Sequence, residues 1–344
     1  MSRRSATLLV AGIGAFVLAV AGAVLPVPYV VLSPGPTVNT LGTGHKGQPL
    51  LQITGHPVYP TTGDLNLVTV TFAGGPGDEI NLFTALQAWL APHDAVVPQQ
   101  EIFGSSTNSK EIQQQNAQQM TSSQETATAA ALNELKIGFQ SQVSVAQTVK
   151  GMPAYTALRP GDVLVAVDGH PVTGQNQAAG LIAGRQPGKP VQLSIRRDGR
   201  TLTERVSSTD HNGKTAIGVV VETQYKFPFS VKISVGQIGG PSAGMMFALG
   251  IIDKLTPDNL TGGRFIAGTG EIEPDGTVDP IGGIQQKMAG ARHDGATVFL
   301  APAANCRDVR GAVPAGLRVV KVATLDQAVQ DLQAIKAGRP TPSC

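Results

Sequence analysis

The amino-acid sequence predicts a multidomain α+β protein with a single transmembrane helix at its N-terminus. Its 344 residues exceed the roughly 250–300 residues at which a single hydrophobic core stops growing. An uncharged apolar run near the start is long enough to span a bilayer. Beyond that run, short β-type segments separated by Gly/Pro turns are combined with several helical stretches, in a chain that contains 41 glycines and 24 prolines. These three observations define the expected fold class.

Charge and cysteine content exclude several functions. Lysine and arginine number 26 against 24 acidic residues, which leaves a formal net charge of +2. A chain this close to neutral has no bulk field to attract nucleic acid, so we expect no nucleic-acid partner. Two cysteines, Cys306 and Cys344, make neither a disulfide framework nor a metal site, and one disulfide between them stays open. We expect no metal and no cofactor.

The N-terminal residues 1–28 are expected to form a membrane anchor. Ala6 to Leu25 is apolar apart from Thr7 and glycines, and its length of about 20 residues spans a hydrocarbon core once. Pro26 and Pro28 end the helix. The paired arginines at positions 3 and 4 predict that the short N-terminal side stays in the cytoplasm. The bulk of the chain is then extracytoplasmic.

A cleaved signal peptide is the alternative interpretation of this segment. Ala21-Gly22-Ala23 fits the small-residue pattern that signal peptidase accepts. The apolar run is nevertheless longer than the roughly 7–15 residues of a signal-peptide core, which favours an uncleaved single-pass anchor. Both interpretations place the following domains outside the cytoplasm.

Residues 29–125 are expected to form a membrane-proximal α+β region. Tyr29–Leu32, Leu50–Thr54 and Leu65–Phe72 are β-type runs separated by Gly/Pro turns. Ile80–Leu90 is an apolar stretch that predicts a helix.

The next segment, residues 126–210, is predicted to be β-rich. A short helix is expected at Gln175–Ala183, and turn dipeptides are present at Asp168-Gly169 and Asp198-Gly199. The expected strands are Val143–Val149, Val163–Val167, Val191–Arg196 and Thr201–Val206. The Val-rich strand is preceded by Leu158-Arg159-Pro160-Gly161-Asp162 and followed by an Asp-Gly turn. This order of elements resembles a PDZ domain of the bacterial protease-associated kind, and the resemblance covers about Thr126–Thr209.

This resemblance implies a peptide-binding loop at Lys136-Ile137-Gly138-Phe139, which matches the family's X-Φ-Gly-Φ pattern. The amides of Ile137, Gly138 and Phe139 would then hold a carboxylate, and the strand after them would accept a peptide by β-augmentation. A β-rich spacer that binds nothing is the alternative, because a fold does not guarantee a ligand.

A candidate nucleophile precedes a helix near residue 245. Gly239-Gly240-Pro241-Ser242-Ala243-Gly244 leads into Met245–Leu255, which is hydrophobic nearly all round and predicts a buried helix. Pro241 suits the first helical position, which places Ser242 in the first turn, beside unpaired amides and the positive end of the helix dipole. Such amides are the donors that an oxyanion needs. A serine at this position is equally compatible with a helix cap.

A candidate base lies on a second helix, which Gly282-Gly283 opens. Lys287 falls on the apolar face of this helix, whereas Gln285 and Gln286 fall on the other side. The apolar positions are Ile284, Met288 and Ala291. Burial lowers the pKa of a lysine toward neutrality, and a general base requires that property. The alternative is a lysine that extends from the rim of the face into solvent.

Three motifs are similar in order and spacing to those of the proteolytic domain of Lon-type proteases, and the resemblance runs from about Gly218 to Asp331. The expected domain is residues 211–338, and residues 339–344 are a tail. The motifs are Gly240–Gly244, Gly268-Thr269-Gly270-Glu271-Ile272 and Pro280–Lys287. The resemblance implies a Ser–Lys dyad at Ser242 and Lys287, with Thr269 orienting the amine. One departure is Gly239, where Lon proteases usually carry an acidic residue.

The whole arrangement resembles the membrane-anchored PDZ–Lon-like peptidases of Gram-positive bacteria, which implies cleavage of exported peptides or flexible protein segments outside the cell. The string Gly184–Pro190 lacks the spacing of a phosphate-binding loop, so we expect no nucleotide partner and an ATP-independent serine endopeptidase. Peptide or protein substrates and one membrane span are the expected partners. A homo-oligomer stays open.

Two rival functions remain. Gly240-x-Ser242-x-Gly244 also fits the nucleophile elbow of an α/β-hydrolase esterase, but His293, the sole later histidine, falls in the tail of the Lys287 helix. The other rival is a membrane-tethered PDZ scaffold with an inactive protease domain, which the presence of both Ser242 and Lys287 disfavours.

Overall fold

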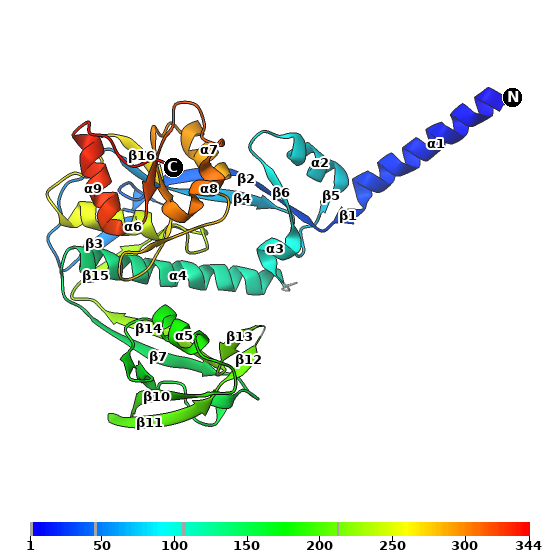
Figure 1. Cartoon of the computed structure of the whole chain (residues 1–344). Coiled ribbons are helices and arrows are strands. Elements are labelled where there is room, and N and C mark those ends of the chain that lie inside the picture. The colour runs from blue at the N-terminus through cyan, green and yellow to red at the C-terminus, as the bar shows by residue number, and fades with distance from the viewer. Residues whose placement is uncertain (1–2, 45–46, 105–107, 212) are drawn as a thin grey trace. The chain divides into compact units, whose positions relative to one another are not determined.

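The computed structural model describes residues 3–44, 47–104, 108–211 and 213–344 (Figure 1). The chain divides into two compact units. One unit joins the chain up to Lys136 with Phe229–Cys344, and the other is Ile137–Pro228. The second unit is therefore an insertion within the first.

The discontinuous unit is built on a six-stranded sheet in the order β20-β19-β16-β4-β2-β6. Parallel pairing joins β4 to β16, β16 to β19 and β19 to β20, whereas β2 runs antiparallel to both β4 and β6. Of the parallel strands, β16 and β19 are apolar and almost wholly buried, as expected for strands that lie inside a sheet covered by helices. The strands are β2 (Tyr29–Asn39), β4 (Asp64–Ala73), β6 (Ala95–Pro98), β16 (Phe265–Gly268), β19 (Val298–Pro302) and β20 (Arg318–Val322).

Four helices pack around this sheet. Helix α7 packs against β2 and β4, and α6 contacts β4, α9 and the long helix α4 (Figure 1). Every residue of α6 except Lys254 is buried, as expected for a helix that is hydrophobic nearly all round. Their bounds are α4 (Ser109–Glu134), α6 (Gly244–Leu255), α7 (Ile284–His293) and α9 (Leu325–Lys336).

The remaining elements of this unit are shorter, apart from the N-terminal helix. Helix α1 (Arg3–Val24) is long and apolar enough to cross a membrane, a property that a signal sequence shares. Helix α2 (Leu82–Leu90) begins two residues later than expected, because Oδ1 of Asn81 accepts the Thr84 amide and caps it. The others are β1 (Pro26–Val27), β3 (Leu51–Thr54), β5 (Ile80–Asn81), α3 (Gln99–Phe103), β15 (Ser230–Ile233), β17 (Glu271–Ile272), β18 (Val278–Asp279) and α8 (Cys306–Val309).

Residues 29–125 do not form a separate region. Their strand β4 lies in the middle of the sheet, where Leu65–Leu67 pairs with Ile266–Gly268 of β16. The sheet takes β2, β4 and β6 from the segment before the inserted unit and β16, β19 and β20 from the segment after it. The membrane-proximal segment and the C-terminal segment therefore share one core.

The boundaries of the β-rich unit also differ from the expected 126–210. At the start, residues 127–132 belong to the buried half of α4 and pack in the other unit, so the inserted unit begins at Ile137. At the end, β14 (Val219–Lys226) pairs along β7 (Gln140–Thr148), which extends the unit to Pro228. Both differences arise from contacts between residues that are distant in sequence.

The inserted unit is a sheet in the order β11-β10-β8-β7-β14, with the short β9 beside β8. Helix α5 (Gln175–Ala183) has the expected bounds, and the turns contain Asp168 and Asp198 at φ 51° and 50°, as Asp-Gly hairpin turns require. Its further strands are β8 (Val163–Val167), β9 (His170–Pro171), β10 (Pro190–Arg197), β11 (Arg200–Ser207), β12 (Thr209–His211) and β13 (Lys214–Ala216).

A disulfide joins Cys306 of α8 to Cys344, with 5.0 Å between the two Cα atoms. This bond answers the question that the sequence left open. It ties the C-terminal tail to the unit that contains Ser242.

Candidate active site

Ser242 lies in the turn that leads directly into α6, two residues before the first helical residue, Gly244. The sequence placed it in the first helical turn, a difference within the usual uncertainty of a helix end. Gly240 has φ +84°, a conformation that glycine adopts without strain, and it turns the chain toward the helix. The side chain of Ser242 is thus held beside the N-terminus of α6.

Lys287 is 3% exposed and lies on the face of α7 that it shares with Ile284, Met288 and Ala291. Its Nζ donates hydrogen bonds to Oγ of Ser242 at 2.8 Å and to Oγ1 of Thr269 at 3.0 Å. Burial disfavours the charged amine and lowers its pKa from 10.5 to about 8. A large fraction of the amine is therefore neutral at mildly alkaline pH.

Thr269 follows the last residue of β16 and is 1% exposed. Its hydroxyl accepts from Lys287 and donates to the main-chain oxygen of Ser242 at 2.9 Å. The Gly270 amide donates to the same oxygen at 2.8 Å. Thr269 consequently fixes both the lysine amine and the main chain of the serine, and the structure brings together all three residues that the sequence selected.

Helix α4 supports the serine turn, a role that the sequence did not reveal. Oγ of Ser123 donates to the Pro241 oxygen at 2.9 Å, and the Gly240 amide donates to the Asn116 oxygen at 3.0 Å. A Cβ atom on Gly239 would lie 2.8 Å from Cβ of Asn116. The close approach of α4 explains why a glycine stands where an acidic residue was expected. A lone serine within a polar helix carries no signal for this role.

Gln286 corrects the expected polar face of α7. Gln285 is exposed and donates to the Asp308 oxygen at 2.9 Å, but Gln286 is only 6% exposed. Helix α7 contacts α8 and β19 as well as β2 and β4, so it is covered on more than one side. Periodicity alone identified one buried face and missed the second.

The expected peptide-binding loop at Ile137, Gly138 and Phe139 lies at the entry to the inserted unit. Its aromatic ring, Phe139, packs on Tyr225 and Phe227, with centroid separations of 6.0 and 5.4 Å. The strand after it, β7, is paired with β14 along its whole length and with β8 at its middle. This strand offers no continuous free edge for an added peptide, which corrects the expectation of β-augmentation there.

A second X-Φ-Gly-Φ sequence, Ala216-Ile217-Gly218-Val219, precedes β14. Within the part of the chain that the structure describes, β14 pairs with β7 only and forms an edge of the sheet. Gly218 has φ +78°, and a Cβ atom there would lie 2.0 Å from Cβ of Met152, so the turn requires glycine.

Helix α5 is held beside this edge strand. The Gln175 amide, at the start of α5, donates to Oγ1 of Thr223 in β14 at 2.9 Å. Beyond the C-terminal end of α5, the Arg185 oxygen accepts a 2.5 Å hydrogen bond from Oγ1 of Thr215, which lies just before the second loop. The second loop thus has the structural context that the pattern requires, a free strand edge beside a helix.

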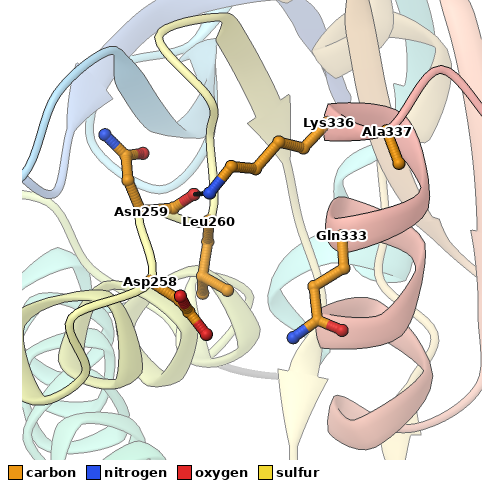
Figure 2. A pocket seen from close by; sticks show the side chains of 6 residues that line it. All are labelled: Asp258, Asn259, Leu260, Gln333, Lys336 and Ala337. Carbon is orange, nitrogen blue, oxygen red and sulfur yellow. Dashed lines mark hydrogen bonds between the residues drawn. The ribbon is translucent and has the colours of Figure 1, made fainter.

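A cavity of about 490 Å³ lies elsewhere in the discontinuous unit, between the α6–β16 connection and α9 (Figure 2). Nζ of Lys336 donates to the Asn259 oxygen at 3.1 Å across it. The lining residues are Asp258, Asn259, Leu260, Gln333, Lys336 and Ala337. Since neither Ser242 nor Lys287 lines it, this cavity does not mark the candidate active site.

Comparison with protein families identifies two segments of the chain. Residues 113–207 match a PDZ domain, and residues 224–334 match the Lon protease (S16) C-terminal proteolytic domain. The second match supports a serine peptidase. Strands β2, β4 and β6 and helix α4 lie wholly or largely outside it, yet they complete its sheet and support its serine turn.

Curated relatives match over the proteolytic part. Lon protease 1 of Bacillus subtilis is 30% identical over 33% of this chain and 15% of its own length. The Lon protease of Heliobacterium modesticaldum is 37% identical over 30% of this chain and 13% of its own length. Lon protease 2 of Herpetosiphon aurantiacus is 42% identical over 26% and 11%. The chain thus spans about a seventh or less of these relatives.

Solved structures match over a similar share of the chain. The PDZ domain of an SdrC-like protein from Listeria innocua is 21% identical, covering 23% of this chain and 92% of its own, with a TM-score of 0.22. The corresponding domain from Listeria monocytogenes is also 21% identical, covering 23% and 85%, with a TM-score of 0.22.

Proposed function

We propose that this chain, which carries a PDZ domain and the Lon-type proteolytic domain of a serine peptidase, is an ATP-independent endopeptidase anchored in the membrane by α1. The proposal rests chiefly on one observation: Nζ of the buried Lys287 lies 2.8 Å from Oγ of Ser242, and burial lowers its pKa to about 8. A serine hydroxyl is a weak nucleophile, and a neutral amine at this distance is a base that can activate it.

Peptide-bond cleavage then proceeds in two steps, acylation and deacylation of Ser242. Neutral Lys287 takes the proton from Oγ of Ser242 as that oxygen attacks the substrate carbonyl carbon. The tetrahedral intermediate collapses, the C–N bond breaks, and the leaving amine takes the proton from Lys287, which leaves an acyl ester on Ser242. Lys287 then takes a proton from water, the hydroxide attacks the ester, and the proton returns to Oγ of Ser242 as the acid product departs.

The negative charge of the tetrahedral intermediate needs donors. At the start of α6 the Gly244 and Met245 amides donate to the Pro241 and Gly270 oxygens, so the donors that remain for an oxyanion are the Ser242 and Ala243 amides in the preceding turn, at the positive end of the helix dipole. We assign these amides to the oxyanion. Thr269 is a positioning residue, because its hydroxyl is bonded to the Ser242 carbonyl and to the Lys287 amine.

Substrate capture is assigned to the open edge of β14. The Val149 amide donates to the Gly218 oxygen, and Val219 is paired with Thr148. In an antiparallel ladder this makes Val219 a non-hydrogen-bonded position, so its N–H and C=O point away from β7. An extended peptide can add there as a further strand, with its carboxylate at the Gly218 turn.

Location and energy source complete the proposal. Helix α1 holds the catalytic unit at the extracytoplasmic face of the membrane, where flexible segments of exported proteins are the accessible substrates. Cleavage restricted to such segments requires no unfolding motor.

The test uses the full-length chain in lipid nanodiscs, with an unstructured peptide as substrate and a serine-reactive phosphonate as probe. We expect peptide cleavage without ATP and a covalent phosphonate adduct on Ser242, with both lost in Ser242→Ala. Cleavage that persists in Ser242→Ala would contradict the proposal. A wild-type chain that neither cleaves nor labels would support the inactive scaffold instead.

A further inference from the structure

Helix α2 has the reverse of the usual amphipathic arrangement. Its small residues Ala85 and Ala88 face the core, where they pack with Val31 and Ile80. Its large apolar residues face outward. They are Leu82, Phe83, Leu86, Trp89 and Leu90, exposed by 44, 49, 45, 71 and 77%. A helix that contacted only water on this side would carry polar residues there.

The outward apolar residues form one continuous stripe. At 3.6 residues per turn they fall within an arc of about 120°, which we call the α2 apolar face. The exposed polar residues Thr84 and Gln87 lie outside this arc, and α2 contains no charged residue. Exposed apolar stripes of this kind mark contact with a protein or a membrane.

The position of α2 distinguishes between these two partners. A Cβ atom on Gly22 of α1 would lie 3.3 Å from the ring of Phe83 and 3.6 Å from Leu82. Gly22 is near the C-terminal end of the apolar α1 helix, the end that meets the extracytoplasmic surface in the proposed topology. The α2 apolar face therefore adjoins the end of the span.

We propose that α2 lies in the outer interfacial layer of the bilayer, with its apolar face inserted among the lipid chains. The proposal rests on the membrane anchoring proposed for α1. Tryptophan is enriched at this layer, and Trp89 is the one tryptophan of the chain. An interfacial helix buries its apolar face about 5–10 Å below the headgroups.

This second attachment constrains the catalytic unit. Helix α2 contacts β2 and β6, which belong to the same sheet as the strand β16 that leads to Thr269. A single span alone would let the unit rotate away from the membrane. With α2 embedded, the sheet stays close to the lipid surface.

Trp89 provides its own test in the full-length chain. The chain is placed in phosphatidylcholine vesicles, either plain or containing lipid brominated at a shallow or a deep position of the acyl chain. We expect about half of the Trp89 fluorescence to be quenched by the shallow bromine and clearly less by the deep one. Leu86→Glu adds a charge to the apolar face and should abolish most of the quenching. Gln87→Glu adds the same charge on the polar face and should leave it unchanged.

The outcomes separate the two proposals. If the chain floats with vesicles but Trp89 is not quenched, the α2 inference is wrong and the anchor stands. Quenching that Leu86→Glu leaves intact would mean that proximity to α1 alone explains it, which also overturns the inference. Fluorescence that depends on protein concentration without lipid quenching would assign the face to a second copy. A chain that does not float contradicts the anchor and, with it, the inference, whereas labelling of Ser242 tests catalysis independently.

Discussion

The dyad and the peptide-binding loop differ in what determines them. At the dyad, Ser242 and Lys287 are 45 residues apart in sequence, and their side chains meet at 2.8 Å. In the inserted unit the X-Φ-Gly-Φ pattern stands before both β7 and β14, and in the described part of the chain the copy before β14 leads into a strand with a free edge whereas the copy before β7 does not. The dyad could be predicted from its motifs because its chemistry depends on which side chains are present. The peptide-binding loop could not, because a site built from main-chain amides can be located only when the order of the strands is known.

The largest effect is expected at the dyad. Lys287→Arg should lower kcat/KM for the unstructured peptide on the order of 10⁴-fold, as should Ser242→Ala, because a guanidinium cannot give up its proton at usable pH. The matched control is Lys254→Arg, which changes a lysine of α6 away from the dyad and should keep activity. Peptide hydrolysis measured by mass spectrometry gives all three values. Normal turnover by Lys287→Arg would exclude lysine as the base.

Thr269 should contribute less because it positions groups without reacting. Thr269→Val removes the hydroxyl that binds Lys287 and the Ser242 carbonyl, and we expect kcat to fall roughly 10–100-fold with little change in KM. Thr269→Ser restores the hydroxyl and should recover most of the activity. If valine and serine behaved alike, the role of Thr269 would be packing alone.

Substitutions at the edge of β14 should change KM and leave kcat unchanged. Val219→Pro removes the outward amide, and we expect KM for a peptide with a free C-terminal carboxylate to rise about 5–10-fold. Val219→Ala keeps the amide and serves as the matched control. Gly138→Pro in the other loop should leave KM unchanged, and these three loop variants should hydrolyse a small generic ester at the wild-type rate. A larger effect at Gly138 than at Val219 would reverse the comparison between the two loops.

The smallest effect is on stability and follows from the lowered pKa of Lys287. Because the folded-state pKa is about 8 and the unfolded value is 10.5, the folded chain resists protonation and its stability rises with pH between these values. Below pH 8 the cost is at most about 3 kcal/mol. Lys287→Met should therefore raise the free energy of unfolding at pH 7 and lose this advantage near pH 10.5. Denaturant unfolding at the two pH values measures this gain in the free energy of unfolding. An equal gain at both pH values would show that the lowered pKa of Lys287 is not its cause.

Local patterns predicted the bounds of helices in both units well. Gln175–Ala183 has the expected bounds, and Met245–Leu255 differs from α6 by one residue, because apolar periodicity and glycine punctuation are short-range signals. The burial of Lys287 followed from the same kind of pattern. Burial of Gln286 did not, since it depends on what covers the far side of α7.

Long-range pairing accounts for what the sequence could not predict. Strand β4 joins β16 some 200 residues later, and β14 joins β7 across the inserted unit, so neither unit boundary is encoded locally. Ser123 of α4 supports Pro241 from a position 118 residues earlier in the sequence, a contact that no local pattern indicates. Cys306 and Cys344 offered no geometric cue until the fold brought them together.

The most direct test of the Ser242–Lys287 assignment is the pH dependence of phosphonate labelling at Ser242 in the full-length chain. We expect a labelling rate that rises tenfold per pH unit in acid and levels off above about pH 8, where Lys287 becomes neutral, with no such rise in Lys287→Met. A rate that is independent of pH, or that continues to rise to pH 10.5, would contradict it.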